Sequence, residues 1–229
     1  PSKAQDWLFE DIIHLDTMRK KEYDYYVKLL LFFLDPEKIV DKDLTDPNRE
    51  FFKPNSKGYF NSEKVIDFEK LLADVLNIEE VKVQLVAAVS AIEECSYLEM
   101  KRFLTFSSVE LSKVLITGIT DSGEMFFPPI PNLIFTRDIG IVINDHILLN
   151  KPARRARSRE SLLAKYIFFN HPLFTSLTGK IIEIEEDEEH FLLPEDQGKR
   201  IDTLEGGDVM MVAPNHLLIG ISERTTVEA

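Results

Sequence analysis

The chain has 229 residues, 44% hydrophobic and 29% charged, a composition typical of a soluble globular protein with a sizeable core. Its formal net charge of −13 argues against binding nucleic-acid phosphates, which requires a basic face. The single cysteine, Cys95, excludes an intrachain disulfide framework and is typical of a reducing compartment. With no signal peptide and no apolar run long enough to span a bilayer, we expect a cytoplasmic protein without membrane contact.

The first part of the chain favours helices. Apolar residues recur at near-helical spacing from Asp11 to Leu34 and predict a helix, whereas residues 41–62 are rich in Asp, Asn, Pro and Lys and predict a loop. Lys64–Leu76 predicts a short strand that runs into a helix. Two more helices are predicted, over Ile78–Cys95 and Ser107–Ile119. The second has Ser107 or Ser108 as its N-cap. Cys95 is interpreted as a packed thiol within helical sequence.

The pattern changes after "PPIPNL". Gly140–Asn150 alternates between apolar and polar residues and predicts a hairpin that turns at Asn144-Asp145. An amphipathic helix is expected over Glu160–Phe174, and Gly179–Asp187 predicts a strand followed by an acidic loop. A second hairpin is predicted over Asp208–Ser222, with its turn at Pro214-Asn215.

The two hairpins form an internal repeat at an offset of 70 residues. The matched pairs are Asp138 and Asp208, Val142 and Val212, His146 and His216, Leu148 and Leu218, and Arg154 and Arg224. Repeats of this size are copies of one supersecondary unit that pack against each other, and two copies rarely close a core alone. The chain also starts without a methionine and stops directly after an apolar strand. We therefore expect it to be part of a longer polypeptide.

The string "LEGGD" at Leu204–Asp208 holds two carboxylates three residues apart around a pair of glycines. Glycines allow close backbone approach and unusual φ values, so both acids can be presented tightly. If the repeats are related by a pseudo-rotation, Asp138 and Asp208 take equivalent places, and Glu205 points into the same space. Gathered carboxylates favour a cation, and a planar guanidinium matches them best because it pairs bidentately.

Four segments together resemble the arginine deiminase family, and their order and spacing make the resemblance specific: "PNLIFTRD", "ARSRE", "LEGGDV" and "IGISERT". "WLFEDI" and "VIDFEKLL" resemble earlier segments of the same family more loosely. The resemblance implies part of a five-bladed α/β propeller of the guanidino-modifying superfamily. It also implies hydrolysis of free L-arginine to citrulline and ammonia through a covalent cysteine intermediate, with no cofactor and no metal.

The resemblance implies a role for each site residue. Asp138 pairs with the substrate guanidinium, Glu205 lies beside it and the catalytic histidine, and Asp208 supports the pocket. Asn132, Arg157 and Arg224 hold the α-amino and α-carboxylate ends of arginine. Arg157 is chosen by its "R-x-R-E" context, whereas the internal repeat indicates Arg154, and both remain open.

The family's His-x-Asp element and late cysteine do not occur after the last strand, so this chain alone is expected to be inactive. "HLD" at His14–Asp16 lies upstream of every other motif and is interpreted as a coincidence. The expected organisation is a first-blade helical segment, a loop and mainly helical insertion, and two repeat units carrying the pocket, over residues 1–40, 41–120 and 121–229. The catalytic part would lie beyond them.

Two other functions are compatible with these motifs. One is an amidinotransferase of the same fold, which passes the amidino group to an amine instead of water. The other is a non-catalytic binding protein that keeps the carboxylate pocket. The arginines of "R-x-R-E" and "SERT" favour a free amino acid as substrate, and retention of the acids favours an enzyme because gathering carboxylates has a desolvation cost. The sequence is compatible with a homo-oligomer, but no segment of it specifically indicates one.

Overall fold

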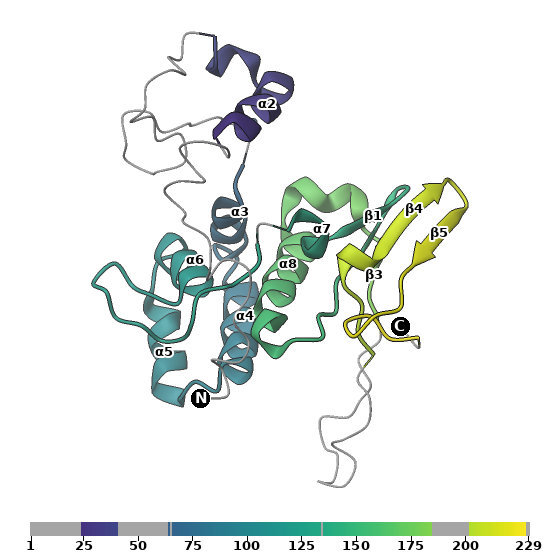
Figure 1. Ribbon diagram of the computed structural model, residues 1–229. Coiled ribbons are helices and arrows are strands. Elements are labelled where there is room, and N and C mark those ends of the chain that lie inside the picture. Colours follow the sequence, from purple (N-terminus) through teal and green to yellow (C-terminus); the bar gives the residue numbers. More distant parts are fainter. Residues whose placement is uncertain (1–23, 41–63, 65, 134, 185–201, 228–229) are drawn as a thin grey trace, which may run out of the picture. The chain divides into compact units, whose positions relative to one another are not determined.

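The computed structural model describes residues 24–40, 64, 66–133, 135–184 and 202–227. These residues form helices and short strands, which confirms the mixed α/β class (Figure 1). The chain divides into two compact units between Phe68 and Glu69, and each is described by itself. Within the described ranges, no helix combines the length and apolar character needed to cross a membrane. Several predictions fall on other residues, namely the helix over 11–23, the loop over 41–62, His14–Asp16 and the acidic loop from 185.

The described part of the first unit is mainly one helix. Helix α2 spans Asp24–Leu34, within the predicted helix, and the 3-10 helix η4 follows at Pro36–Lys38. Asp35 is 3% exposed, and its carboxylate accepts a hydrogen bond from Lys64 Nζ at 3.3 Å. This ion pair joins the end of α2 to the chain that leads into the second unit.

The second unit begins with four helices, which Figure 1 shows as α3 to α6: Phe68–Val75, Glu79–Ile92, Tyr97–Thr105 and Ser108–Thr117. Their shared core consists of fully buried apolar side chains, including Leu72, Leu85, Val89, Phe103, Leu111 and Leu115. The predicted N-cap Ser107 is confirmed, because its hydroxyl accepts a hydrogen bond from the Glu110 N–H at 3.2 Å. Helix α4 also packs against α8 of the next segment.

Two expectations for this helical part are wrong, and one helix was missed. The described residues before α3 form a turn and extended chain, not a strand. The helix predicted to reach Cys95 ends at Ile92, so Cys95 lies in the turn before α5. Helix α5 itself was not predicted, although Ser96 and Glu99 form a capping box, the reciprocal hydrogen bonds typical of a helix start.

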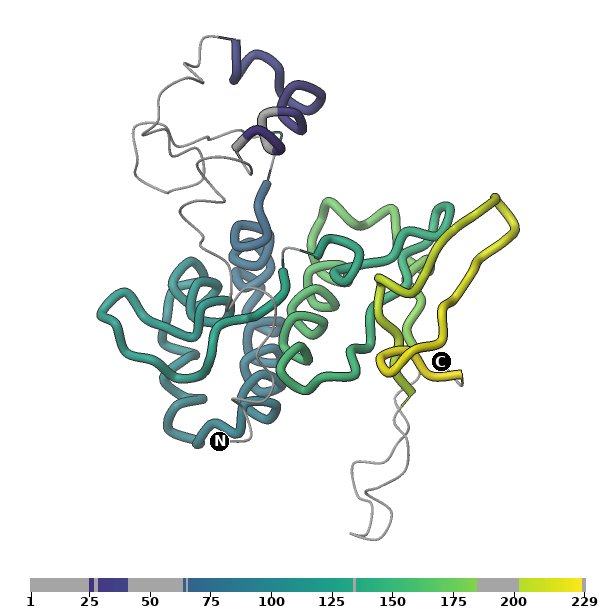
Figure 2. The backbone as a smooth tube through the Cα atoms, in the orientation of Figure 1, coloured from purple at the N-terminus to yellow at the C-terminus, as the bar shows by residue number. Residues whose placement is uncertain are grey.

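The remaining elements carry the internal repeat. The first copy starts with helix α7 (Thr136–Ile139) and strands β1 (Ile141–Ile143) and β2 (His146–Leu148). The 3-10 helix η5 (Arg155–Arg157) and helix α8 (Ser158–Asn170) follow. It ends with the 3-10 helix η6 (Pro172–Leu177) and strand β3 (Ile181–Ile182). The second copy contains η8, β4 and β5: Gly206–Asp208, Val209–Ala213 and His216–Ile219. Both predicted hairpins and the intervening strand are confirmed. The helix predicted over Glu160–Phe174 is confirmed as far as Asn170, where α8 ends and η6 follows. The backbone can be followed through both hairpins in Figure 2.

The two hairpins differ by one residue in their pairing. In the first, β1 and β2 are antiparallel with Ile143 opposite His146, and β3 adds to β2 in parallel. In the second, Ala213 lies opposite His216, which is the equivalent pair, but the register shifts between Met211 and Ala213. Val212 is therefore the extra residue of a β-bulge, an irregularity that the first hairpin lacks.

The two copies are joined through their backbones and a small core. Lys151 and Leu204 exchange hydrogen bonds of 3.0 and 2.9 Å, so the chain after β2 pairs with the start of the second copy. At the hairpin tips, Asn144 Nδ2 donates to the carbonyl of Pro214 at 2.9 Å. The shared core contains the buried side chains Ile141, Leu148, Leu204 and Val209. This packing fixes the starts of the two hairpins side by side.

Candidate functional site

The starts of the two hairpins enclose a buried arginine. The Arg157 side chain is 1% exposed, and its Nη2 donates to Asp138 Oδ2 at 2.7 Å. Its Nε and Nη2 both donate to Glu160 Oε2 at 3.2 Å, and its Nη1 donates to Glu205 Oε2 at 3.1 Å. With Arg224, whose Nη1 lies 3.2 Å from Glu205 Oε2, these residues form what we call the arginine–carboxylate cluster.

Short elements place each member of this cluster. Asp138 lies in α7. Arg157 is the last residue of η5 and directly precedes α8, and Glu160 lies in the first turn of α8, where a carboxylate is favoured by the helix dipole. Glu205 directly precedes η8. Arg224 follows β5, so the members come from four separate segments that the repeat packing brings together.

The two glycines of "LEGGD" have different roles. A Cβ built on Gly206 would lie 2.2 Å from the Arg137 carbonyl oxygen and 3.0 Å from the Asp138 nitrogen, so the two backbones approach too closely for a side chain. A Cβ on Gly207 would meet nothing within 4 Å. The predicted close approach is therefore confirmed at Gly206. Neither glycine is among the positive-φ residues, so the freedom in φ that glycine allows is not used here.

The charges of the cluster do not cancel. Three carboxylates and two guanidiniums give a formal sum of −3 + 2 = −1 when all are ionised. Burial raises the pKa of Glu160 to about 6, although the charge of Arg157 and the N–H of Asn132 act in the opposite direction. Burial also opposes the charge of Arg157, but attraction by Glu160, Asp138 and Glu205 outweighs it and raises the pKa of the guanidinium.

One oxygen of the cluster lacks a hydrogen-bond donor. Glu205 is 4% exposed, and its Oε1 is buried without a hydrogen-bond partner in the part of the chain that the structure describes. A buried carboxylate oxygen normally accepts at least one hydrogen bond, since an unpaired one has a large desolvation cost. Together with the excess negative charge, this oxygen favours one further cation at the cluster.

Asn132 and Asp208 reach the cluster indirectly. The backbone N–H of the buried Asn132 donates to Glu160 Oε1 at 2.7 Å, so Glu160 joins this residue to Arg157. Asp208 Oδ2 accepts hydrogen bonds from the hydroxyls of Ser222 at 2.8 Å and Thr225 at 2.6 Å. Asp138 and Asp208 therefore keep equivalent places before the hairpins, but their carboxylates have different partners.

Thr225 connects the two acids of "LEGGD". Its hydroxyl donates to Asp208 and accepts a hydrogen bond from the Glu205 N–H at 3.1 Å, and the residue is 0% exposed. The segment that carries Arg224 is thus fixed to the start of η8. The Arg224 side chain itself is 51% exposed and extends over Glu205 from the solvent side.

The structure brings Arg157 into the cluster and leaves Arg154 outside it. Arg154 is exposed, and its side chain makes no hydrogen bond or ion pair with any residue in the described ranges. Sequence reasoning gave no role to Glu160 or Thr225. The signal for Glu160 was present, because its spacing of three residues from Arg157 favours an ion pair on one turn of helix. No local signal distinguishes Thr225 from any other loop threonine.

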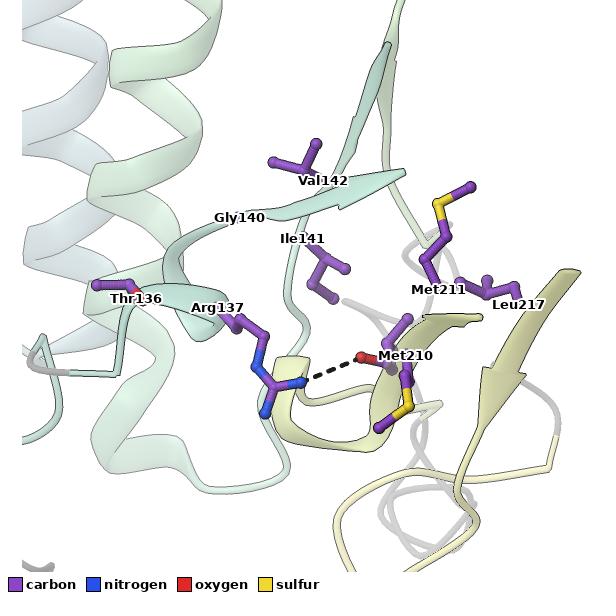
Figure 3. A pocket seen from close by; sticks show the side chains of 9 residues that line it. Thr136, Arg137, Gly140, Ile141, Val142, Met210, Met211 and Leu217 are labelled. Carbon is purple, nitrogen blue, oxygen red and sulfur yellow. Dashed lines mark hydrogen bonds between the residues drawn. The ribbon is translucent and has the colours of Figure 1, made fainter. Parts of the chain in front are cut away.

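A separate apolar cavity lies between the hairpins (Figure 3). Its volume is about 410 Å³, and Arg137 borders it and donates to the carbonyl of Val209 at 3.4 Å. The lining is otherwise mainly apolar and comes from β1, β4 and β5: Ile141, Val142, Val209, Met210, Met211 and Leu217. None of the cluster carboxylates lines this cavity. Within the described ranges, no group of three or more His, Cys, Asp or Glu side chains is placed to hold a metal ion.

The fold and the cluster define an α/β protein that holds a guanidinium among carboxylates at the starts of two repeated hairpins. The family described as "Arginine deiminase" matches residues 5–229, and the chain belongs to this family. Arginine deiminases from Listeria innocua and Treponema denticola are 29% and 26% identical to it, over 100% of this chain and 51% of each relative. A third, from Streptococcus gordonii, is 29% identical over 98% of the chain and 51% of its own length. The chain thus spans about half the length of the curated relatives it matches.

Proposed function

We propose that the full-length polypeptide that contains this chain hydrolyses the guanidinium group of free L-arginine to citrulline and ammonia. The observation that carries this proposal is the arginine–carboxylate cluster, in which Asp138 and Glu205 already bind a guanidinium, that of Arg157. The family membership supports the same substrate class. Glu205 Oε1 has no hydrogen-bond partner among the described residues, and together with the net negative charge it favours one more cation, as the substrate requires.

In this proposal, the chain binds and orients the substrate. Asp138 and Glu205 hold the substrate guanidinium, and Asp208 supports Glu205 through Thr225. Asn132, Arg157 and Arg224 hold the α-amino and α-carboxylate ends. A cysteine thiolate from the other half attacks the guanidinium carbon, and ammonia leaves with a proton from a histidine. Water then gives a proton to the same histidine as its oxygen attacks the thiouronium carbon, the C–S bond breaks, and citrulline is released while the thiolate re-forms.

A propeller is the fold proposed for the full-length polypeptide, and the repeat supports it. On β2, the outward N–H groups of Ile147 and Leu149 donate to the strand beside it, at 3.0 and 2.8 Å. The equivalent residues on β5 are Leu217 and Ile219, and in the described ranges β5 pairs only with β4. An unpaired edge of this kind is a place for a further strand. The repeat predicts that this strand is parallel to β5, as β3 is to β2.

The test is the conversion of L-arginine by the full-length polypeptide, with citrulline and ammonia measured together. Glu205→Gln and Asp138→Asn each remove a charge from the guanidinium site, and each is expected to lower kcat/KM on the order of 1,000-fold. Asp121→Asn is the matched control, because Asp121 is exposed and pairs with Lys113 away from the cluster. Circular dichroism establishes that each variant is folded.

The outcomes separate the alternatives. Turnover retained in both cluster variants would refute the assignment of the site. Product formed only when an amine acceptor is added would indicate an amidinotransferase. Binding of arginine without any product would indicate a non-catalytic protein.

A further inference from the structure

The guanidinium of Arg157 occupies the oxygens that the proposed function assigns to the substrate. It makes four hydrogen bonds with three carboxylates, including the 2.7 Å bond to Asp138 Oδ2. Two guanidiniums on the same buried oxygens would repel each other and would share too few acceptors. A substrate guanidinium therefore has to compete with Arg157 for Asp138 and Glu205.

The cluster gives the substrate a first point of attachment. Glu205 Oε1 has no hydrogen-bond partner in the described ranges, whereas Oε2 of the same carboxylate accepts from Arg157 and Arg224. Oε1 is buried and the half-exposed Arg224 lies on the solvent side of Glu205, so an incoming guanidinium pairs with Oε1 once Arg224 moves aside and while Arg157 still holds its own bonds. It then lies on the same carboxylate as Arg157 Nη1, and the repulsion between the two cations weakens the hold on Arg157.

Glu160 provides a pivot for the displaced side chain. Its Oε2 accepts from Arg157 Nε, the nitrogen closest to the backbone, and the two residues are three apart at the start of α8. The terminal nitrogens Nη1 and Nη2 hold Asp138 and Glu205. A rotation about the end of the side chain thus releases those two carboxylates and the Nη2 bond to Glu160, while the Nε bond to Glu160 is kept.

We infer that Arg157 is a specificity-determining residue that exchanges partners when substrate binds. This inference rests on the proposed function. The substrate guanidinium replaces Arg157 on Asp138 and Glu205, and the α-carboxylate of the same substrate becomes the new partner of Arg157. After the exchange, both guanidiniums have a carboxylate partner only when the ligand carries a carboxylate as well as a guanidinium. An alkylguanidinium without a carboxylate displaces Arg157 but leaves its terminal nitrogens unpaired.

The magnitude follows from the bonds that are lost. A carboxylate-free guanidinium leaves two charge-assisted hydrogen bonds of Arg157 without replacement, which weakens its binding by a factor on the order of 100. Removal of Arg157 abolishes this penalty. The same removal weakens L-arginine binding, because the α-carboxylate then has one cation fewer.

The experiment titrates n-butylguanidinium into the full-length natural polypeptide by calorimetry and measures KM for L-arginine in parallel. Arg157→Ala is expected to bind n-butylguanidinium on the order of 100-fold more tightly than the wild type and to show a raised KM for arginine. Arg155→Ala is the matched control, since Arg155 is an exposed arginine two residues earlier that pairs with Glu94. It is expected to behave as the wild type in both measurements.

An Arg157→Ala variant that is folded but binds n-butylguanidinium no more tightly than the wild type would overturn the exchange. Arg157→Met, which keeps the apolar stem, serves where the alanine variant fails to fold. If both Arg157 variants are unfolded and n-butylguanidinium does not restore their folding, Arg157 is needed for the fold itself and the inference is wrong. Tighter n-butylguanidinium binding by a variant of a protein that makes no citrulline would keep the exchange and reject only the proposed reaction.

Discussion

The pair Gly206 and Gly207 offers a sharp test of how the site is built. Replacement of Gly206 by alanine puts a Cβ 2.2 Å from the Arg137 carbonyl oxygen and 2.5 Å from its carbon. Both atoms are backbone, so no side chain can rotate away to relieve the contact. Relief requires the two segments to separate by about 1 Å, and overpacking of this kind costs about 3 kcal/mol.

The separation also changes the cluster. The Asp138 nitrogen lies 3.0 Å from the same Cβ, so a shift of this backbone moves the carboxylate that bonds Arg157 at 2.7 Å. Gly206→Ala is therefore expected to lower both stability and affinity for L-arginine. Gly207→Ala meets nothing within 4 Å and needs no positive φ, so it is expected to be neutral or to stabilise by up to about 1 kcal/mol.

The assay compares the urea denaturation midpoints of the two variants with that of the wild type, followed by the KM for arginine. We expect the Gly206→Ala variant to be much less stable than the Gly207→Ala variant. Failure of Gly206→Ala to fold, while Gly207→Ala folds, gives the same answer. Free energies of unfolding of the two variants that agree within about 0.5 kcal/mol would show that the close approach to Arg137 is not tight, and the reasoning would be refuted.

Two further predictions concern protonation and a buried hydroxyl. Burial raises the pKa of Glu160 from 4.5 to about 6, so its ionisation costs the folded state stability as pH rises through this window. The stability of Glu160→Gln relative to the wild type should therefore increase by about 2 kcal/mol between pH 4.5 and pH 7 in urea denaturation, and a constant difference would contradict this. Thr225→Val removes the donor to Asp208 and leaves the Glu205 N–H unpaired, with an expected loss of about 2 kcal/mol in the same assay, whereas exposed Thr175→Val should change little.

Elements set by local sequence were predictable. The alternation of apolar residues and the turn pairs at Asn144 and Pro214 fixed both hairpins, and Ser107 marked the start of α6. The bulge at Val212 was not predictable, since either register leaves an apolar strand and the choice depends on packing against the first hairpin. Helix α5 was missed although Ser96 starts it, because the helical pattern was read through the turn before it.

The sequence predicted most residues of the site but not which of them bond to one another. The "R-x-R-E" string places Arg157 and Glu160 on one helical turn, so their contact is local. The bonds from Arg157 to Asp138 and Glu205 join residues 19 and 48 positions apart, and only the packing of the two repeats creates them. The sequence therefore indicated a guanidinium site without showing that an arginine of the chain itself occupies it.

The energetics of the cluster favour an exchangeable role over a purely structural one. Buried ion pairs lose much of their Coulombic gain to desolvation, and well-packed apolar residues often stabilise a core equally well. A cluster held only for stability would also be expected to satisfy its oxygens, yet Glu205 Oε1 has no partner in the described ranges and the formal charge is −1. Both features lower the cost of releasing Arg157 when a second guanidinium arrives. The imbalance is thus what a site requires if its own arginine is to be replaced by that of a substrate.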